Sequence, residues 1–211
     1  MNNYKIISLE KDQKRRENLI KNLKSLNISN FEIINAVNGL GLNDNVLSNA
    51  IIELDDWWRN NKVRKNGYAC TLSHIKAIEK ARKDNLEYVI VLEDDCYLEK
   101  DPKTFIPDFE WDMIFIGSVF DKEIKNNISR IQKIHYTHCV MIHQKFYNKL
   151  IEYYKKYTDV IDETLNYSNI FKENNIFGIK GHAYQNSKDS NILNTDNKLG
   201  IYGKETYKKQ F

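Results

Sequence analysis

Short apolar runs alternate with stretches of helical periodicity along this chain of 211 residues. Runs rich in Ile, Val and Leu are typical of strands that are buried on both faces of a sheet. Such runs occur at residues 4–9, 31–34, 88–92, 112–116 and 137–142. Because helical patterns separate most of these runs, the sequence predicts an α/β domain with a mostly parallel central sheet.

Apolar residues at helical spacing predict the connecting helices. The first is expected after an N-cap at Asp12, and the second from about Ala69 to Lys83. A third should bury Phe146, Leu150, Ile151 and Tyr154, and a fourth should begin near Asp162.

Two stretches lack a clear pattern. Residues 40–66 are expected to be irregular or weakly helical, and they carry Trp57 and Trp58, which could stack on a sugar or anchor the core. The whole chain, 1–211, is predicted to be one domain, with residues from about 186 to 211 as a polar, mobile C-terminal segment.

The strand at 88–92 runs directly into three carboxylates, Glu93, Asp94 and Asp95. Adjacent acids repel one another, and a divalent cation such as Mg²⁺ or Mn²⁺ would turn that repulsion into attraction. Ligands of open α/β sheets bind beyond the carboxyl ends of the strands, where these acids lie. The simpler alternative is an acidic surface turn.

Composition narrows the function classes. The net charge is only +3, so we expect no nucleic-acid partner. The three cysteines, Cys70, Cys96 and Cys139, show no metal-ligand spacing, and the five histidines give no tetrahedral zinc set. With no signal-peptide core and no apolar stretch of membrane-spanning length, a reduced cytoplasmic protein without a transmembrane segment is expected.

Four segments in order resemble one family. They are Ile7-Ser8-Leu9 followed by Arg15, the turn 36–39 (Ala-Val-Asn-Gly), the stretch 70–74 (Cys-Thr-Leu-Ser-His) and the acidic stretch 92–95 (Leu-Glu-Asp-Asp). Together they resemble glycosyltransferase family 25, which includes lipooligosaccharide and collagen-modifying galactosyltransferases. The resemblance covers residues 4–118 best. Asn38 replaces an acid of the family pattern, and the stretch 66–69 departs from its Gly-Glu-x-Gly.

The resemblance implies a GT-A (Rossmann-like) fold, a nucleotide-sugar donor such as a UDP-sugar, a Mn²⁺ or Mg²⁺ ion, and inversion at the anomeric carbon. It makes Asp95 the preferred metal ligand, with Glu93 holding the ribose or a metal-bound water, and His182 as the candidate third ligand. The residues implied at the donor are Ser8, Leu9, Arg15, Asn38, Gly67, Ser73, Glu93 and Asp94.

An inverting transferase needs a base that takes a proton from the acceptor hydroxyl. Asp162, Glu163 and Asp121 are candidates, and the resemblance favours Asp162, whose alternative role is a helix N-cap. His74 is expected to be structural, whereas His138 matches a family position near the acceptor.

The predicted activity is transfer of a hexose, galactose or glucose, to a glycan, a lipid-linked saccharide (lipooligosaccharide) or a collagen-like acceptor. Two alternatives remain. A nucleotidyltransferase or phosphohydrolase also gathers acids at strand ends, although no phosphate loop of the Walker type is present. A GT-A module could also bind a nucleotide-sugar or glycan without turning it over.

Overall fold

The computed structural model describes residues 2–43, 45, 61–120, 128–156 and 160–185. The elements of its N-terminal half are β1 (Tyr4–Ser8), α1 (Gln13–Ser25), β2 (Phe31–Asn35), η1 (Gly39–Gly41), α2 (Asn61–Lys83), β3 (Tyr88–Glu93), β4 (Cys96–Leu98) and η3 (Pro102–Phe105). The rest comprises β5 (Met113–Ile116), β6 (Val119–Phe120), β7 (Ser129–Arg130), β8 (Ile134–His135), β9 (Cys139–His143), η4 (Gln144–Phe146), α3 (Tyr147–Lys156), α4 (Ile161–Tyr167), α5 (Ile170–Glu173), β10 (Ile176–Ile179) and β11 (Ala183–Gln185).

The centre of the molecule is a seven-stranded sheet of order β2-β1-β3-β9-β5-β10-β7. β1 pairs in parallel with β2 and β3, and β5 pairs in parallel with β10. β9 is antiparallel to both β3 and β5, and β7 is antiparallel to β10. Five of these strands therefore share one direction, which confirms the α/β class with a mixed sheet and is consistent with the GT-A-like fold implied by the resemblance.

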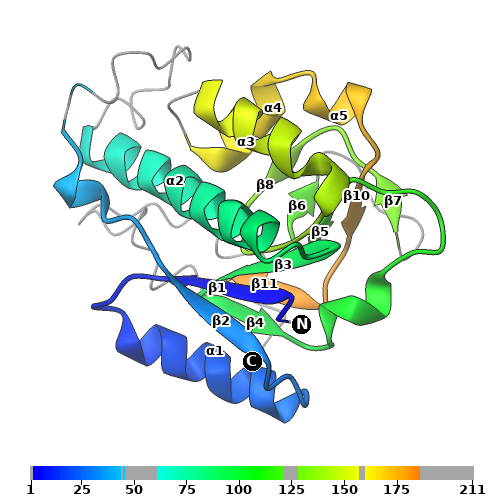
Figure 1. Cartoon of the computed structure of the whole chain (residues 1–211), viewed down its shortest axis with the longest axis horizontal. Coiled ribbons are helices and arrows are strands. Elements are labelled where there is room, and N and C mark those ends of the chain that lie inside the picture. Colours follow the sequence, from blue (N-terminus) through cyan, green and yellow to red (C-terminus); the bar gives the residue numbers. More distant parts are fainter. Residues whose placement is uncertain (1, 44, 46–60, 121–127, 157–159, 186–211) are drawn as a thin grey trace.

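Helices cover both faces of this sheet, with α2 and α3 on one side and α1 on the other (Figure 1). Along β3, Val89 and Val91 pack into the core on the α2 side, whereas Ile90 and Leu92 pack into the core on the α1 side. This alternation follows from the two-residue period of a strand. It explains why the run at 88–92 is continuously apolar.

The second helix begins earlier than the sequence predicted, at Asn61 rather than near Ala69. Its first two turns are polar and carry no apolar stripe, so periodicity could not reveal them. Close packing at two glycines supports them instead: a Cβ on Gly67 would meet Cγ2 of the Val160 side chain at 2.5 Å, and one on Gly39 would meet the Asn66 backbone at 2.7 Å. Trp57, Trp58 and the C-terminal segment 186–211 lie outside the described residues.

Within the described part of the chain, no helix has the length and apolar character needed to cross a membrane.

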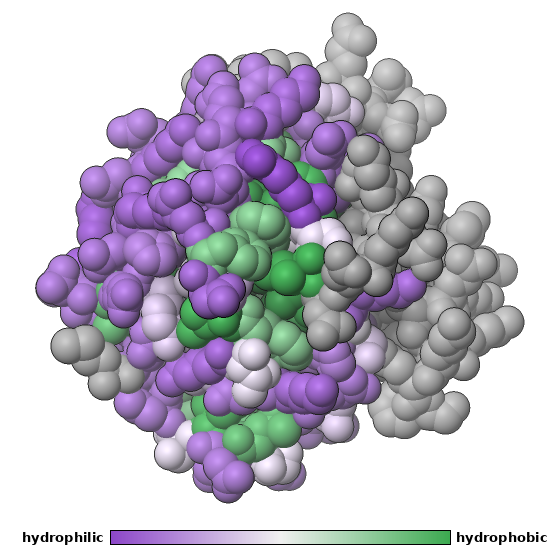
Figure 2. Space-filling view, turned by 90° about the vertical axis from the view of Figure 1, so that its right-hand side faces the viewer, coloured by the Kyte–Doolittle hydropathy of each residue, from purple (hydrophilic) through white to green (hydrophobic). Residues whose placement is uncertain are grey.

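Figure 2 views the side that lies on the right in Figure 1, where apolar side chains gather at the centre of a largely hydrophilic face. The loop between η3 and β5 lies on this side, and its Ile106 and Phe109 are exposed. Phe109 packs against Phe177 of β10, with ring centroids 5.0 Å apart.

Candidate functional site

A pocket opens where β1, β2 and β3 end together. The three strands are parallel, so their carboxyl ends lie at one edge of the sheet, beside the start of α1 and the N-terminal half of α2. The pocket is lined by Ile7, Ser8, Leu9, Lys11, Asp12, Arg15, Ala36, Val37, Asn38, Gly39, Leu40, Asn66, Ala69, Cys70, Ser73, Glu93, Asp94 and Asp95. This position agrees with the observation that ligands of open α/β sheets bind beyond the carboxyl ends of the strands.

Backbone hydrogen bonds fix the acidic turn at the end of β3. The amide of Asp94 donates to the Ile7 carbonyl at 3.1 Å, and the amide of Glu93 donates to the His138 carbonyl at 3.0 Å. The Arg15 guanidinium lies 2.5 Å from Asp94 Oδ1 and 3.0 Å from Asp95 Oδ2. Arg15 thus bridges the second and third acids.

The other oxygen of each acid has no hydrogen-bond partner among the described residues, and both Asp94 Oδ2 and Asp95 Oδ1 are buried. Unsatisfied buried carboxylate oxygens are costly unless something pairs with them. Hard oxygen ligands of this kind suit Mg²⁺ or Mn²⁺, so the residues fit the predicted cation. Burial, followed by the charge of Glu93, raises the pKa of Asp95 to about 7, and Arg15 opposes this shift.

Glu93 turns away from its two neighbours. It follows Leu92, which faces α1, and its own side chain faces α2. Its Oε1 accepts a hydrogen bond from Thr137 Oγ1 at 2.9 Å and lies 3.3 Å from His74 Nε2. Burial alone would raise the pKa of Glu93, but His74, Thr137 and the nearby His138 together lower it.

Several residues predicted at the donor line the pocket and also shape it. Ser73 Oγ accepts a hydrogen bond from the Val37 amide at 2.9 Å, which ties α2 to the loop after β2. Asn38 Oδ1 accepts from the Leu40 amide at 3.1 Å and caps η1. Ser8 and Leu9, at the end of β1, also line the pocket. These four residues and Arg15 therefore share one cavity with the acidic turn.

Gly67 is not among the lining residues. It packs against Val160, which leaves no room for a Cβ, while its neighbour Asn66 reaches the pocket. Its predicted donor contact stays a prediction, and the observed reason for glycine at this position is helix packing.

Asp162 is the second residue of α4 and does not line the pocket. Its Oδ2 accepts a hydrogen bond from the Tyr136 amide at 3.3 Å, and its Oδ1 accepts one from the Glu163 amide at 3.0 Å. Burial raises the pKa of Asp162, against the two amide contacts. Tyr136 has a φ of +76°, a value that non-glycine residues seldom adopt. Asp121, the other acid considered as a base, lies outside the described residues.

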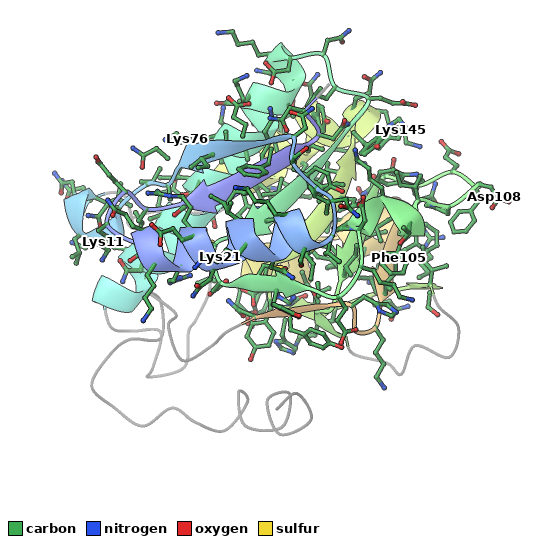
Figure 3. All side chains as sticks on the ribbon, turned by 90° about the horizontal axis from the view of Figure 1, so that it is seen from below. Lys11, Lys21, Lys76, Phe105, Asp108 and Lys145 are labelled. Carbon is green, nitrogen blue, oxygen red and sulfur yellow. The ribbon has the colours of Figure 1, made fainter. Side chains whose placement is uncertain are left out.

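His182 does not line the pocket. Its ring stacks on Phe105, with centroids 5.0 Å apart, and its Nδ1 is 3.5 Å from Glu99 Oε2. Phe105 and Lys11, which lines the pocket, lie on opposite sides of Figure 3. The residue of this segment that approaches the acids is Gln185, whose Nε2 lies 3.2 Å from Asp95 Oδ2.

Sequence reasoning did not single out the contacts made by Thr137 and Gln185, or the grouping of Cys70 with His74 and Glu93. The Cys70–His74 spacing of four residues on a predicted helix was a readable signal, since such residues share a helix face. The position of Gln185 depends on pairing of β11 with β4. His138 is buried, and its ring lies close to Glu93 and to the backbone of Ala183; burial lowers its pKa.

Comparisons with known proteins agree with the sequence resemblance. Residues 1–155 match the family model of glycosyltransferase family 25 (LPS biosynthesis protein). No curated protein sequence matches the chain.

Among solved structures, one similar chain is a glycosyltransferase involved in the glycosylation of the major capsid of PBCV-1, with 12% identity and a TM-score of 0.40. That match covers 72% of this chain and 64% of the other, so the chain spans less than two thirds of its length. Another is A197 from STIV, with 12% identity, a TM-score of 0.47, and coverage of 88% of this chain and 85% of that one.

Proposed function

The chain belongs to glycosyltransferase family 25, and we propose that it transfers a hexose, galactose or glucose, from a UDP-sugar to an acceptor hydroxyl with inversion of configuration. The observation that carries this proposal is a pair of buried carboxylate oxygens, Asp94 Oδ2 and Asp95 Oδ1, that have no hydrogen-bond partner among the described residues and lie beside the guanidinium of Arg15. A site that holds two acids and one arginine at the end of a sheet suits a cation and a diphosphate together.

Asp94 and Asp95 would hold Mn²⁺ or Mg²⁺, with a third ligand from the segment that contains His182 and Gln185. Bound there, the cation would neutralise the negative charge that grows on the departing diphosphate. Arg15 would bind the same diphosphate, because a guanidinium pairs well with phosphate oxygens and already lies at this end of the sheet.

The remaining wall of the pocket would orient the nucleotide. Ser8 and Leu9 at the end of β1 and Asn38 in the turn after β2 present backbone and side-chain polar groups to the cavity. Ser73 keeps this turn in place through its hydrogen bond with Val37. Fixed polar groups of this kind set the orientation of a donor without reorganising during the reaction.

Asp162 is proposed as the base that takes the proton from the acceptor hydroxyl. A raised pKa brings a carboxylate closer to the range that suits proton transfer near neutral pH. Its oxygens accept hydrogen bonds from the backbone amides of Tyr136 and Glu163, so the carboxylate is held in one orientation. A glycan, a lipid-linked saccharide or a collagen-like chain is the proposed acceptor.

The test is release of nucleotide from a set of sugar nucleotides, with and without Mn²⁺. We expect UDP from UDP-galactose or UDP-glucose, slowly in the absence of acceptor, and loss of release in excess chelator. Asp95→Asn should lower transfer by about 10²-fold or more, whereas Asp108→Asn, at an exposed position near Phe105 (Figure 3), should have no effect.

Three results would contradict the proposal. They are full activity in chelator, a fully active Asp95→Asn enzyme, and release of pyrophosphate from nucleoside triphosphates without any acceptor. The last would favour a nucleotidyltransferase. Metal-dependent binding of UDP-sugars with no turnover of any donor would instead indicate a binding module.

A further inference from the structure

A second group of potential metal ligands lies beside the pocket, on the α2 side of the acidic turn. Cys70 and His74 are four residues apart on α2 and so lie on one face of the helix, and Glu93 is the last residue of β3. His74 Nε2 is 3.3 Å from Glu93 Oε1, and Cys70 Sγ is 3.9 Å from the same oxygen. One ligand atom from each of the three residues lies within 4.8 Å of the others.

This spacing suits a small metal ion. Zinc binds thiolate sulfur at about 2.3 Å and imidazole nitrogen or carboxylate oxygen at about 2.0–2.2 Å in a tetrahedral arrangement. Ligand atoms around one such ion must therefore lie roughly 3–4 Å apart, which is the separation of the His74 and Cys70 atoms from Glu93.

The chemical types of the ligands distinguish this group from the Asp94 and Asp95 pair. A set of sulfur, nitrogen and oxygen favours borderline ions such as Zn²⁺, whereas two carboxylates favour Mg²⁺ or Mn²⁺. Glu93 points toward α2 and the other two acids are bridged by Arg15, so the two groups of ligands are separately built.

Neighbouring groups complete the arrangement. Thr137 Oγ1 donates a hydrogen bond to Glu93 at 2.9 Å, and would orient the carboxylate as an outer-shell partner. Burial, and then the charges of Glu93, Asp162, Asp95 and Asp94, raises the pKa of the Cys70 thiol. A divalent cation in contact with the sulfur would reverse that effect, and binding would release the thiol proton to water.

We propose that Cys70, His74 and Glu93 form a binding site for Zn²⁺ or a similar ion, separate from the Asp94 and Asp95 site. The three side chains would supply three ligands of a tetrahedral ion, and the fourth position would be open to the pocket, which Cys70 and Glu93 line. Three protein ligands with one open position are typical of zinc sites that take water or a substrate group. Zinc bound here would lie at the edge of the donor pocket, because two of its ligands line that pocket, and it would inhibit donor binding.

The test is Co²⁺ titration of the chelator-treated protein, followed by absorption spectroscopy. We expect a near-ultraviolet thiolate-to-cobalt charge-transfer band and the visible bands of a tetrahedral ion, both of which equimolar Zn²⁺ removes. Cys70→Ser should abolish the charge-transfer band, and the matched control Cys96→Ser should keep it. His74→Gln should weaken Co²⁺ affinity by at least about 10-fold, and Thr137→Val by about 10-fold or more.

Asp95→Asn separates this site from the proposed activity. It should retain the charge-transfer band although Mn²⁺-dependent UDP binding is lost. The band therefore tests the zinc site, and UDP binding tests the proposed transferase, independently of each other. Absence of the band in the wild-type protein, or its survival in Cys70→Ser, would overturn the zinc site and leave a hydrogen-bonded cluster around Glu93.

A measurement on the wild-type chain avoids any folding defect of the variants. Cys70 is partly exposed, whereas Cys96 and Cys139 are buried. Zn²⁺ should therefore slow alkylation of Cys70 by iodoacetamide, as followed by peptide mass spectrometry, and Mg²⁺ should not. Equal alkylation with and without Zn²⁺ would count against the site.

Discussion

Arg15 and Asp95 form an ion pair at the carboxyl end of β3, with the guanidinium 3.0 Å from Asp95 Oδ2. Both side chains are largely buried, at 16% and 3% exposure. The same guanidinium reaches Asp94 at 2.5 Å, so one cation serves two buried acids. The pair joins the first helix to the acidic turn, two segments that lie about 80 residues apart in the sequence.

Arg15→Ala should weaken binding of UDP in the presence of Mn²⁺. A charge-assisted hydrogen bond contributes about 1.5–3 kcal/mol, which corresponds to roughly 10- to 100-fold in affinity. Calorimetry would measure this change. The control is Lys14→Ala, an exposed position one residue away. Equal affinities for the two variants would mean that Arg15 serves only to pair with the acids.

Asp95→Asn should stabilise the metal-free protein at neutral and alkaline pH. The pKa of Asp95 is about 7 in the folded state, above the ordinary value of 3.8. The native state therefore binds more protons than the unfolded state between these values, and stability falls as pH rises from about 4 to 7.

Asparagine does not titrate, so the stability of the variant should not fall in this way as pH rises. The variant should gain on the order of 4 kcal/mol in free energy of unfolding at pH 8, and the gain should vanish near pH 4. Urea unfolding at both pH values, with chelator present, measures the difference. A gain of the same size at pH 4 would show that it does not come from the charge of Asp95.

Gly117→Ala should strongly destabilise the fold. Gly117 has a φ of +74°, and a Cβ there would lie 1.7 Å from the carbonyl oxygen of Ala183, which is backbone and cannot move aside. We expect a loss of at least about 2 kcal/mol and a fall in Tm of about 4–8 °C. Gly41→Ala is the matched control, since nothing lies within 4 Å of the position that a Cβ would take there. Similar Tm values for the two variants would contradict the packing argument.

Much of this fold could be predicted from the pattern of apolar residues, because most central strands are buried on both faces. The orientation of Glu93 was also readable: Val89 and Val91 face α2, and a strand's two-residue period places Glu93 on the same side. The start of α2 was not readable, because its polar first turns are supported by glycine contacts. β11 was missed because three residues, Ala183–Gln185, form a strand only by pairing with β4.

The candidate site was predicted in part for the same reason. Ser8 is the last residue of β1, and Asn38 and Asp95 follow β2 and β3. The carboxyl ends of these parallel strands meet at one edge of the sheet. Asp162 and His182 were chosen by sequence resemblance and order along the chain. Neither residue lines the pocket. The position of Asp162 depends on its contact with the loop at Tyr136, and that of His182 depends on the pairing of β11 with β4.

Asp162→Asn should lower transfer to acceptor by roughly 10²- to 10⁴-fold, because the base acts only on the acceptor hydroxyl. Donor binding and slow donor hydrolysis should change little. Glu163→Gln tests the neighbouring candidate base: loss of transfer in this variant and not in Asp162→Asn would assign the role to Glu163. Loss of donor binding or a large fall in Tm in Asp162→Asn would instead assign Asp162 to holding Tyr136 through its amide.

The third ligand of the Asp94 and Asp95 site is a choice between His182 and Gln185. His182 would have to leave Phe105 and Glu99, whereas Gln185 already lies 3.2 Å from Asp95 Oδ2. A half-turn of the Gln185 amide would present its oxygen, a hard ligand, to a cation. We therefore expect Gln185→Ala to weaken Mn²⁺ affinity several-fold, and Gln185→Glu to strengthen it by adding a charge. Both are measured by calorimetry with UDP. If His182→Ala loses affinity and Gln185→Ala does not, the ligand is His182, and the segment from Gly181 to Gln185 must rearrange when the donor binds.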